Sequence, residues 1–437
     1  MEKKIYDTYV KILKEELVPA MGCTEPIAIA YAAAVARDTL GEIPDDIEIA
    51  ASGNIIKNVK SVVVPNTGGL RGIPAAAAAG IKAGRAEKKL EVLADITQEQ
   101  IDEVSDYLNQ AKFQVKASQS GCIFDILVTV KKKGHKALVR IQGHHTNLVK
   151  VQKDENVLLD REYFEEGTGQ NGADRGLLNV RDIIQFADEA KISDVREVIE
   201  RQIQYNTAIA KEGMRGNWGA CIGKILLQSY GNSVQNRAKA MAAAGSDARM
   251  SGCEMPVVIN SGSGNQGMTA SLPVIVYAED LNVSKDQMIR ALLVSNLVTI
   301  HLKTGIGTLS AYCGAISAGC GAGAGITYLY GGGYEEIAHT IVNALAINSG
   351  VVCDGAKASC AAKIASAVEA GTLGMKMYQF GSQFYGGDGI VAKGIEETIE
   401  NVAELARDGM RETDRKIIEI MTEKIQGNRQ EKRLQNT

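Results

Sequence analysis

The segment MGCTEP at 21–26 places Cys23 just before a helix that Glu25 and Pro26 can open. Acidic residues and proline are favoured in the first turn of a helix. A thiol at the amino end of a helix has its thiolate stabilised by unpaired N–H groups and by the helix macrodipole. Cys23 is therefore a candidate metal ligand or nucleophile, and a buried thiol in an ordinary turn is the alternative interpretation.

Four more cysteines occur in two segments, AYCGAISAGC and VVCDGAKASC, as Cys313 and Cys320 and as Cys353 and Cys360. A spacing of seven within each pair is two helical turns, so a helix would present both thiols on one face. No CxxC motif is present, which argues against a zinc ribbon or a ferredoxin-type motif. Soft thiolates still select zinc or iron–sulfur groups, so a metal site and buried free thiols both stay open. We expect Cys353 on a loop at a helix end and Cys320 inside a Gly/Ala helix.

The Gly- and Ser-rich segment at 261–267 lies between a strand-like run and a helix that begins near Met268. Glycines allow backbone N–H groups to converge on an anion at a helix start. The P-loop pattern is absent, so a carboxylate is a better ligand than a triphosphate, and a plain connector is the alternative. A weaker loop of the same kind follows the run at 61–66. The residues that we single out in the two loops are Ser261, Ser263, Gly264, Asn265, Asn66, Thr67 and Gly68.

The composition excludes several classes of protein. The chain has 437 residues with 48 Lys+Arg and 52 Asp+Glu, and this near-neutral balance predicts neither nucleic acid nor an anionic membrane as a partner. No apolar run is long enough for a membrane span, and no export signal is recognisable. We therefore expect a cytoplasmic protein whose cysteines are thiols or metal ligands, and we leave a homo-oligomer open.

The fold class predicted by the periodicity is α+β. Residues 1–170 mix helical patterns with strand-like runs, which favours a domain with an antiparallel sheet; strands are expected at 47–52, at 61–66 and in five runs between 113 and 164. Residues 171–425 read as an all-α domain of about ten helices, and GxGxxA at 319–324 reads as close helix packing. The boundary is expected in the turn-rich stretch at 165–176, and residues 426–437 as a flexible tail.

The chain resembles the L-cysteine desulfidases, a family related to the iron–sulfur L-serine dehydratases. The resemblance rests on MGCTEPIAIA, SGCEMPVVINSGSGNQGMTASLPVIVYA, TLSAYCGAISAGCGAGAGI and NSGVVCDGAKASCAAKIA, which together span most of the chain. The likeness to the dehydratases lies mainly in the helical domain, with residues 1–170 corresponding to the dehydratase β domain.

The resemblance implies an oxygen-sensitive four-iron, four-sulfur cluster, which protein purified in air would lose. Cys23, Cys313 and Cys353 match the positions proposed for cluster binding in the desulfidases. Cys360 corresponds to a third helical-domain ligand of the dehydratases, although its spacing from Cys353 is shorter here. A carboxy-terminal cysteine that caps the open iron in some dehydratases has no counterpart in this chain.

The function implied is β-elimination of L-cysteine to sulfide, pyruvate and ammonia without pyridoxal phosphate. The two loops would hold the carboxylate of a small amino-acid substrate. Lys303, Lys357 and His145 are the candidate general bases, and the sequence does not choose among them. The alternatives are an L-serine or L-threonine dehydratase with the same cluster, and a non-catalytic protein that binds metal or senses thiols.

Overall fold

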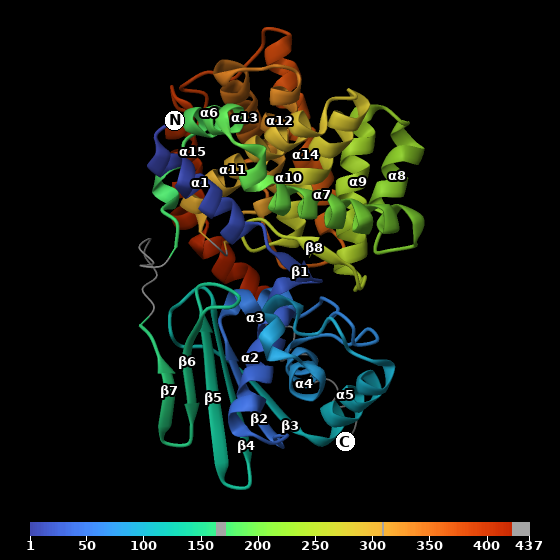
Figure 1. The fold of residues 1–437 in the computed structure, drawn as a ribbon, viewed down its shortest axis with the longest axis vertical. Helices are drawn as coiled ribbons and strands as arrows, with labels where there is room; N and C mark the ends of the chain where they lie inside the picture. Colours follow the sequence, from blue (N-terminus) through green and yellow to red (C-terminus); the bar gives the residue numbers. More distant parts are fainter. Residues whose placement is uncertain (163–171, 308–309, 422–437) are drawn as a thin grey trace.

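The computed structural model describes residues 1–162, 172–307 and 310–421, and it consists of a helical body above a region built on a β-sheet (Figure 1). This arrangement confirms the predicted α+β fold class. The proposed tail at 426–437 lies outside the described residues, as does most of the proposed boundary segment. Among the described helices, none is long and apolar enough to cross a membrane.

The large sheet has six strands in the order β3-β2-β4-β5-β6-β7. Its neighbouring strands pair antiparallel except β2 and β3, which are parallel. The expected antiparallel sheet thus has one parallel pair at its edge, because a helical crossover carries the chain back between these two strands. The strands are β1 (Pro19–Met21), β2 (Asp46–Ala51), β3 (Lys112–Ala117), β4 (Asp125–Lys132), β5 (His135–Gln142), β6 (Leu148–Lys153), β7 (Asn156–Asp160) and β8 (Pro256–Val258).

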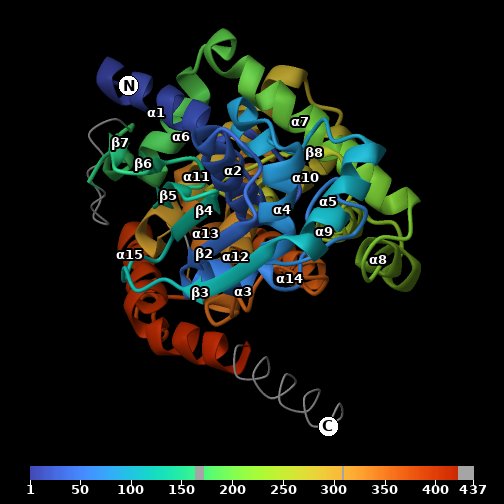
Figure 2. The same cartoon turned by 90° about the horizontal axis from the view of Figure 1, so that it is seen from below.

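The helices of the first part are α1 (Lys3–Glu16), α2 (Thr24–Leu40), α3 (Gly53–Val59), α4 (Ile73–Ala83) and α5 (Gln98–Gln110). Helix α2 is apolar and packs between the sheet and α4 (Figure 2). The first helix does not lie on the sheet. Tyr9 of α1 packs against Phe186 in the helical body, and β1 pairs with β8. The chain therefore crosses between the two parts near residue 22.

The run at 61–66 is not a strand, and this prediction was wrong. Its only ladder contact among the described residues is an isolated bridge between Val63 and Arg71. Val62 and Val64 are fully buried, so the apolar pattern reflects packing and not pairing. Pro65 has no N–H to donate and lies against Gly22, which explains why a sheet does not form here.

The crossing of α2 and α4 leaves no room for a side chain at Gly80. A Cβ there would lie 2.1 Å from the carbonyl oxygen of Ala30. We expect Gly80→Ala to lower the free energy of unfolding by about 1–3 kcal/mol, because the two helices must separate. Urea unfolding measures this change. Gly350→Ala, with nothing within 4 Å of its Cβ, is the control; an equal loss in both variants would contradict the packing argument.

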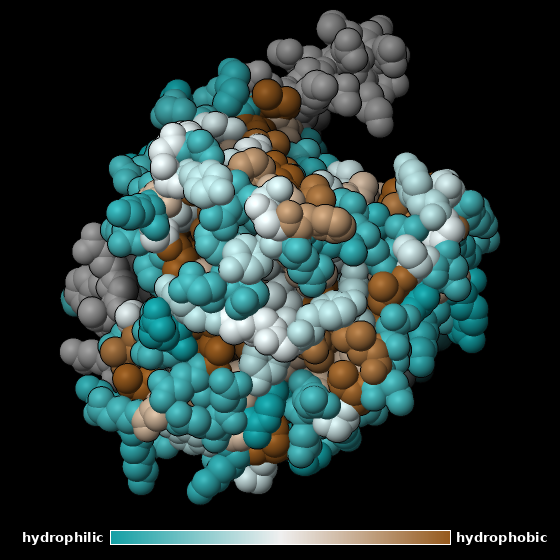
Figure 3. Space-filling view, turned by 90° about the horizontal axis from the view of Figure 1, so that it is seen from above, coloured by the Kyte–Doolittle hydropathy of each residue, from teal (hydrophilic) through white to brown (hydrophobic). Residues whose placement is uncertain are grey.

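The helical body contains α6 to α15 and a further helical segment at 411–421. The helices are α6 (Val180–Glu189), α7 (Ile192–Arg215), α8 (Ile222–Tyr230), α9 (Val234–Met250), α10 (Gly264–Asp280), α11 (Lys285–Ile306), α12 (Gly314–Leu329), α13 (Tyr334–Asn348), α14 (Cys360–Gln379) and α15 (Ile395–Glu404). The GxGxxA segment packs α12 on α14, where a Cβ on Gly323 would lie 2.7 Å from the carbonyl oxygen of Gly371. The face seen in Figure 3 is mainly hydrophilic, with apolar side chains in small groups.

Candidate functional site

Two of the candidate cysteines lie side by side on paired extended segments. Tyr312 and Val352 form an antiparallel bridge. The N–H of Cys313 donates to the carbonyl of Val351 at 3.0 Å, and the N–H of Cys353 donates to the carbonyl of Ala311 at 2.6 Å. Two thiols forty residues apart in the chain are thus held by backbone hydrogen bonds, and Cys353 is on a loop before α14, as expected.

Cys360 joins this pair as the first residue of α14. Its Sγ lies 3.8 Å from the carbonyl oxygen of Gly355 in the intervening loop. Burial raises the pKa of Cys360, and the neighbouring Cys353 adds to the shift. Burial also raises the pKa of Cys313 to about 12, with contributions from Cys353 and Cys360. Cys313 therefore lies close to both Cys353 and Cys360, which places the three residues in one cluster.

Cys23 approaches the same cluster from the other part of the chain. It is 2% exposed and packs with Val62 and Met250, and Cys360 and Ala356 pack against this group. Burial raises the pKa of Cys23 well above its ordinary value, with Glu25 adding to the shift. A thiol held protonated in this way is a poor nucleophile, and as a metal ligand Cys23 would have to release its proton on binding.

The amino ends of several helices meet at these thiols. Cys23 is the N-cap of α2, Cys313 is the N-cap of α12, and Cys360 begins α14. The start of α10 is adjacent, since a Cβ on Gly314 would lie 2.6 Å from the side-chain amide carbon of Gln266. Helix amino ends carry partial positive charge and stabilise anions such as thiolates. The expected helix-end position of Cys23 is confirmed.

The thiols gathered here are soft donors, the kind that zinc and iron–sulfur groups take. Among the described residues, no group of three or more His, Cys, Asp or Glu side chains is arranged to hold one metal ion. A four-iron cluster takes one thiolate for each iron, so its ligands need not converge on a point. The available soft donors are Cys23, Cys313, Cys353 and Cys360, and the remaining cysteine of the paired motifs, Cys320, is buried inside α12 as expected.

Of the candidate bases, Lys303 lies beside these thiols. Its side chain is buried near the end of α11, and none of the described residues accepts a hydrogen bond from its Nζ. Burial lowers the pKa of Lys303 to about 8, although the nearby Cys353 and Cys313 oppose the shift. Lys357 differs, because it is partly exposed and forms an ion pair with Asp354. Burial beside the thiols thus favours Lys303 as the base.

His145 is placed next to the amino end of α2. Its ring is 6% exposed and lies against Gly262, and its Nε2 has no hydrogen-bond partner among the described residues. Burial lowers the pKa of His145 to about 4, although Glu25 opposes the shift. The imidazole is therefore neutral at neutral pH and can accept a proton at Nε2 when Nδ1 carries the hydrogen.

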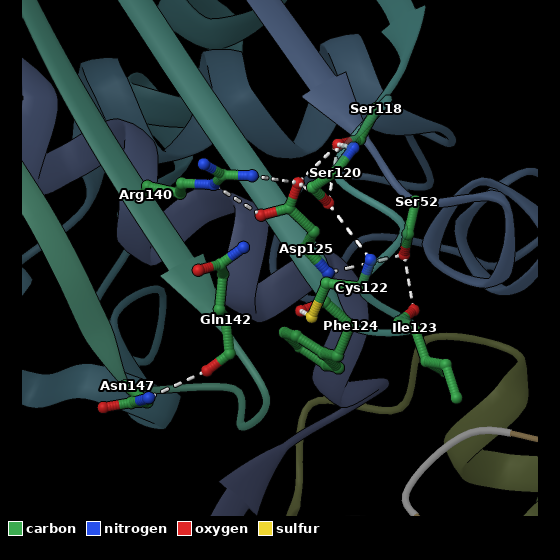
Figure 4. A network of polar contacts seen from close by, with 10 residues as sticks. All are labelled: Ser52, Ser118, Ser120, Cys122, Ile123, Phe124, Asp125, Arg140, Gln142 and Asn147. Carbon is green, nitrogen blue, oxygen red and sulfur yellow. Dashed lines mark hydrogen bonds and ion pairs between the residues drawn. The ribbon is translucent and has the colours of Figure 1, made fainter. Parts of the chain in front are cut away.

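A network at the ends of β4 and β5 fixes the loops around His145 (Figure 4). The buried carboxylate of Asp125 accepts hydrogen bonds from Arg140, Ser118 and Ser120. Phe124, which precedes Asp125, packs edge-on against the ring of His145 with 4.7 Å between centroids. The ion pair between Asp125 and Arg140 thus fixes the segment that contains Phe124, whose ring contacts the imidazole of His145.

Glu25 connects the histidine, Cys23 and helix α3. Its Oε2 accepts from Cys23 Sγ at 3.1 Å and its Oε1 from Asn58 Nδ2 at 2.9 Å. Burial opposes ionisation of Glu25, but the neighbouring imidazole and guanidinium groups and the hydrogen bond from Cys23 outweigh it, so its pKa lies below the ordinary value. A buried carboxylate therefore lies beside the thiol cluster. From the sequence, Glu25 was recognised only as a residue that opens a helix.

The Gly-rich loop reaches the same place. Thr24 Oγ1 donates to the carbonyl of Gly262 at 3.0 Å, which ties the loop to the start of α2. Ser263 is the N-cap of α10 without a side-chain cap, and Ser261 donates to Asn260. The N–H groups of Gly264 and Asn265 lie in the first turn, where they have no intrahelical acceptor. Asn265 Oδ1 accepts from Arg249, a buried residue that sequence reasoning missed.

The second predicted loop contacts the site less directly. Asn66 Nδ2 donates to the carbonyl of Leu93, which ties the loop to the segment after residue 91, and Thr67 Oγ1 donates to the carbonyl of Val64 within the loop. Gly68 adopts φ +65°. Pro65, just before this loop, lies against Gly22 next to Cys23. A substrate role for Asn66, Thr67 and Gly68 stays a prediction.

An ion pair with a buried lysine ties the helical segment at 411–421 to α3, beside which it lies in Figures 1 and 2. Lys57 donates to Asp414 at 2.6 Å and to the carbonyl of Cys353 at 3.3 Å. We expect Asp414→Asn to lower the free energy of unfolding by roughly 3 kcal/mol, because the Lys57 charge stays buried without its partner.

Urea unfolding measures this loss as well. Asp408→Asn is the matched control: Asp408 belongs to an exposed cluster of ion pairs, and its loss is expected to cost less than about 0.5 kcal/mol. Equal effects of the two substitutions would contradict the assigned role of the Lys57 ion pair.

Comparison with known proteins identifies the family of this chain. The family model for the serine dehydratase alpha chain matches residues 87–419, a range that includes the three clustered cysteines of the helical body. The chain belongs to the serine dehydratase alpha-chain family. Its relatives include the UPF0597 protein DSY1109 of Desulfitobacterium hafniense, which is 59% identical over 420 residues, covering 96% of this chain and 97% of that protein. UPF0597 proteins of Lachnoclostridium phytofermentans and Treponema denticola are 52% and 46% identical, covering 95% and 96% of this chain and 100% and 99% of theirs.

Proposed function

We propose that this member of the serine dehydratase alpha-chain family is an iron–sulfur-dependent L-cysteine desulfidase. The observation that carries the proposal is the gathering of four thiols beside a buried lysine: Cys23, Cys313 and Cys360 at helix amino ends, and Cys353 on the loop before α14. Thiols from distant segments, held in a buried place at or near helix amino ends, suit a cluster. Packing alone does not require four thiols at this place, because apolar side chains could fill the same space.

The four cysteines would hold the cluster, with Cys360 the fourth candidate ligand. When bound, the cluster supplies a Lewis acid that stabilises negative charge on the leaving sulfide. The partial positive charge at the amino ends of α2, α12 and α14 lowers the cost of keeping the thiolates deprotonated. A cluster that is lost in air suits a protein in the reducing cytoplasm, and a cytoplasmic location is part of the proposal.

The residues of the chain perform the remaining steps. The free N–H groups at the start of α10 hold the substrate carboxylate and fix its orientation. A base takes the Cα proton; Lys303 is preferred because its amine is buried and lies beside the thiols, and His145 is the second candidate. Lys357 is disfavoured by its exposed ion pair. Loss of the Cα proton and of sulfide leaves 2-aminoacrylate, which tautomerises and hydrolyses to pyruvate and ammonia.

The specific alternative is an L-serine dehydratase with the same cluster, because the family model that matches carries that name. The two are distinguished by supplying anaerobic protein with L-cysteine or L-serine and measuring sulfide and pyruvate. A desulfidase releases sulfide and pyruvate in equal amounts from cysteine and little pyruvate from serine. A larger kcat/KM for serine would replace this proposal with the dehydratase, and no turnover of either would favour a non-catalytic metal-binding or thiol-sensing protein.

A further inference from the structure

Arg249 is a buried arginine that forms no ion pair among the described residues. It ends α9 near the thiol cluster and is 3% exposed. Its Nε donates to the carbonyl of Gly22 at 2.8 Å and its Nη1 to Asn265 Oδ1 at 3.2 Å. None of the described residues accepts a hydrogen bond from Nη2, and none of the described carboxylates forms an ion pair with the guanidinium. Glu25 lies close enough for the guanidinium to lower its pKa, but its carboxylate accepts none of the hydrogen bonds that Arg249 forms with the described residues, so Nη2 can bind a second anion.

The guanidinium lies at the amino end of α10, where further donors are free. A Cβ on Gly264 would lie 2.4 Å from Arg249 Nε, so glycine at this position lets the guanidinium approach the first turn. The first-turn N–H groups have no intrahelical acceptors. Arginine and a helix amino end together match the two oxygens of a carboxylate.

Buried acceptors without partners lie around these donors. Gln266 Oε1, Asn58 Oδ1 and His145 Nε2 each have no hydrogen-bond partner among the described residues, and each side chain is 6% exposed. Gln266 lies against Gly314, next to Cys313, and His145 lies against Gly262. An unsatisfied buried acceptor costs about 1–3 kcal/mol, so donors from outside the chain are expected here. An ammonium group is such a donor.

We propose that Arg249, with the first-turn N–H groups of α10, binds the carboxylate of an α-amino acid whose ammonium group is directed to the unpaired acceptors. The inference rests on the proposed function, since it specifies how the substrate of that site is held. It makes the zwitterionic backbone of the substrate, and not its leaving group, the feature that Arg249 recognises. The rival account is that Arg249 balances the charge of the thiolates, because it also lowers the pKa of Cys23.

The test uses the full chain prepared anaerobically, with L-alanine as an unreactive probe. Isothermal titration calorimetry should detect L-alanine, whereas L-alaninamide, in which a neutral amide replaces the carboxylate, should bind at least tenfold more weakly. Arg249→Gln should weaken L-alanine binding at least tenfold with the iron content per chain unchanged. Arg237→Gln, on the same helix in an ion pair with Asp280 near the surface, is the matched control and should leave both unchanged.

Three outcomes would overturn the inference: no binding of L-alanine, equal binding of the two probes, or loss of iron in Arg249→Gln with L-alanine affinity intact. The comparison of probes on the unaltered protein stands even where Arg249→Gln fails to fold. Failure of the proposed function would give a different result in these experiments. Arg249-dependent binding of L-alanine without iron or sulfide release would remove the desulfidase proposal and leave this carboxylate site.

Discussion

Replacing Cys353 with alanine is expected to abolish sulfide release from L-cysteine, lowering kcat by about a thousandfold or more. The loss follows because Lewis-acid stabilisation of the leaving group contributes several kcal/mol and Cys353 lies near both Cys313 and Cys360. The backbone hydrogen bonds of residue 353 are independent of its side chain, so the fold should persist. The measurements are the initial rate of sulfide release and the iron content, both under anaerobic conditions.

Cys320→Ala is the matched control for this substitution. Cys320 is as fully buried as any thiol in the chain, but it lies inside α12, two turns beyond the cluster. Its loss is expected to affect stability only and to leave iron content and turnover near those of the unaltered protein. If the two variants behave alike, or if Cys353→Ala retains turnover, the thiol cluster is not the catalytic centre.

The second large effect is expected from Lys303→Met. An uncharged side chain of similar length should fit the buried position without loss of stability, since it removes the cost of a desolvated ammonium. Removing the base should lower kcat by about a hundred- to ten-thousandfold. The accompanying readout is the exchange of the Cα proton of L-cysteine with deuterated solvent, which a structural role would not affect.

Lys357→Met separates the two candidate lysines. Its ammonium is partly exposed and paired with Asp354, so its loss is expected to change kcat by less than about tenfold. Iron content is measured in both variants, because both lysines lie near candidate ligands. Unchanged proton exchange in Lys303→Met would assign the base to His145, for which His145→Gln is the corresponding test.

The parts of the site that could be predicted from the sequence are those with a local signal. Glu25 and Pro26, shortly after Cys23, favour a helix start whatever the tertiary surroundings. The Gly/Ala run around Cys320 similarly implies close helix packing, which α12 and α14 display. These features depend on neighbours in the chain, and local physical rules are sufficient for them.

The residues that were missed depend on distant partners. Arg249 ends a helix whose residues 240–250 are buried almost throughout, so no amphipathic period marked it. From the sequence, Lys57 is indistinguishable from a surface lysine. In the structure its side chain is buried and paired with Asp414, far along the chain. Glu25 was recognised only as a helix-opening residue. In each case the function of the charge depends on tertiary packing, which no spacing rule contains.

The wrong strand at 61–66 and the parallel edge pair have a related cause. Alternating apolar residues indicate burial, and not strand pairing itself. In the run at 61–66, Val62 is buried against Cys23 and Met250 without a sheet. Strand direction is decided by the length and content of the connection, here helices α3 to α5 between β2 and β3.

The central claim is that the four cysteines hold an iron–sulfur cluster. The most direct measurement is the amount of iron and acid-labile sulfide in the full chain purified without oxygen. The account predicts about four of each per chain, lost on exposure to air together with sulfide release from L-cysteine. Protein that contains neither, while remaining folded and releasing sulfide from L-cysteine, would contradict it.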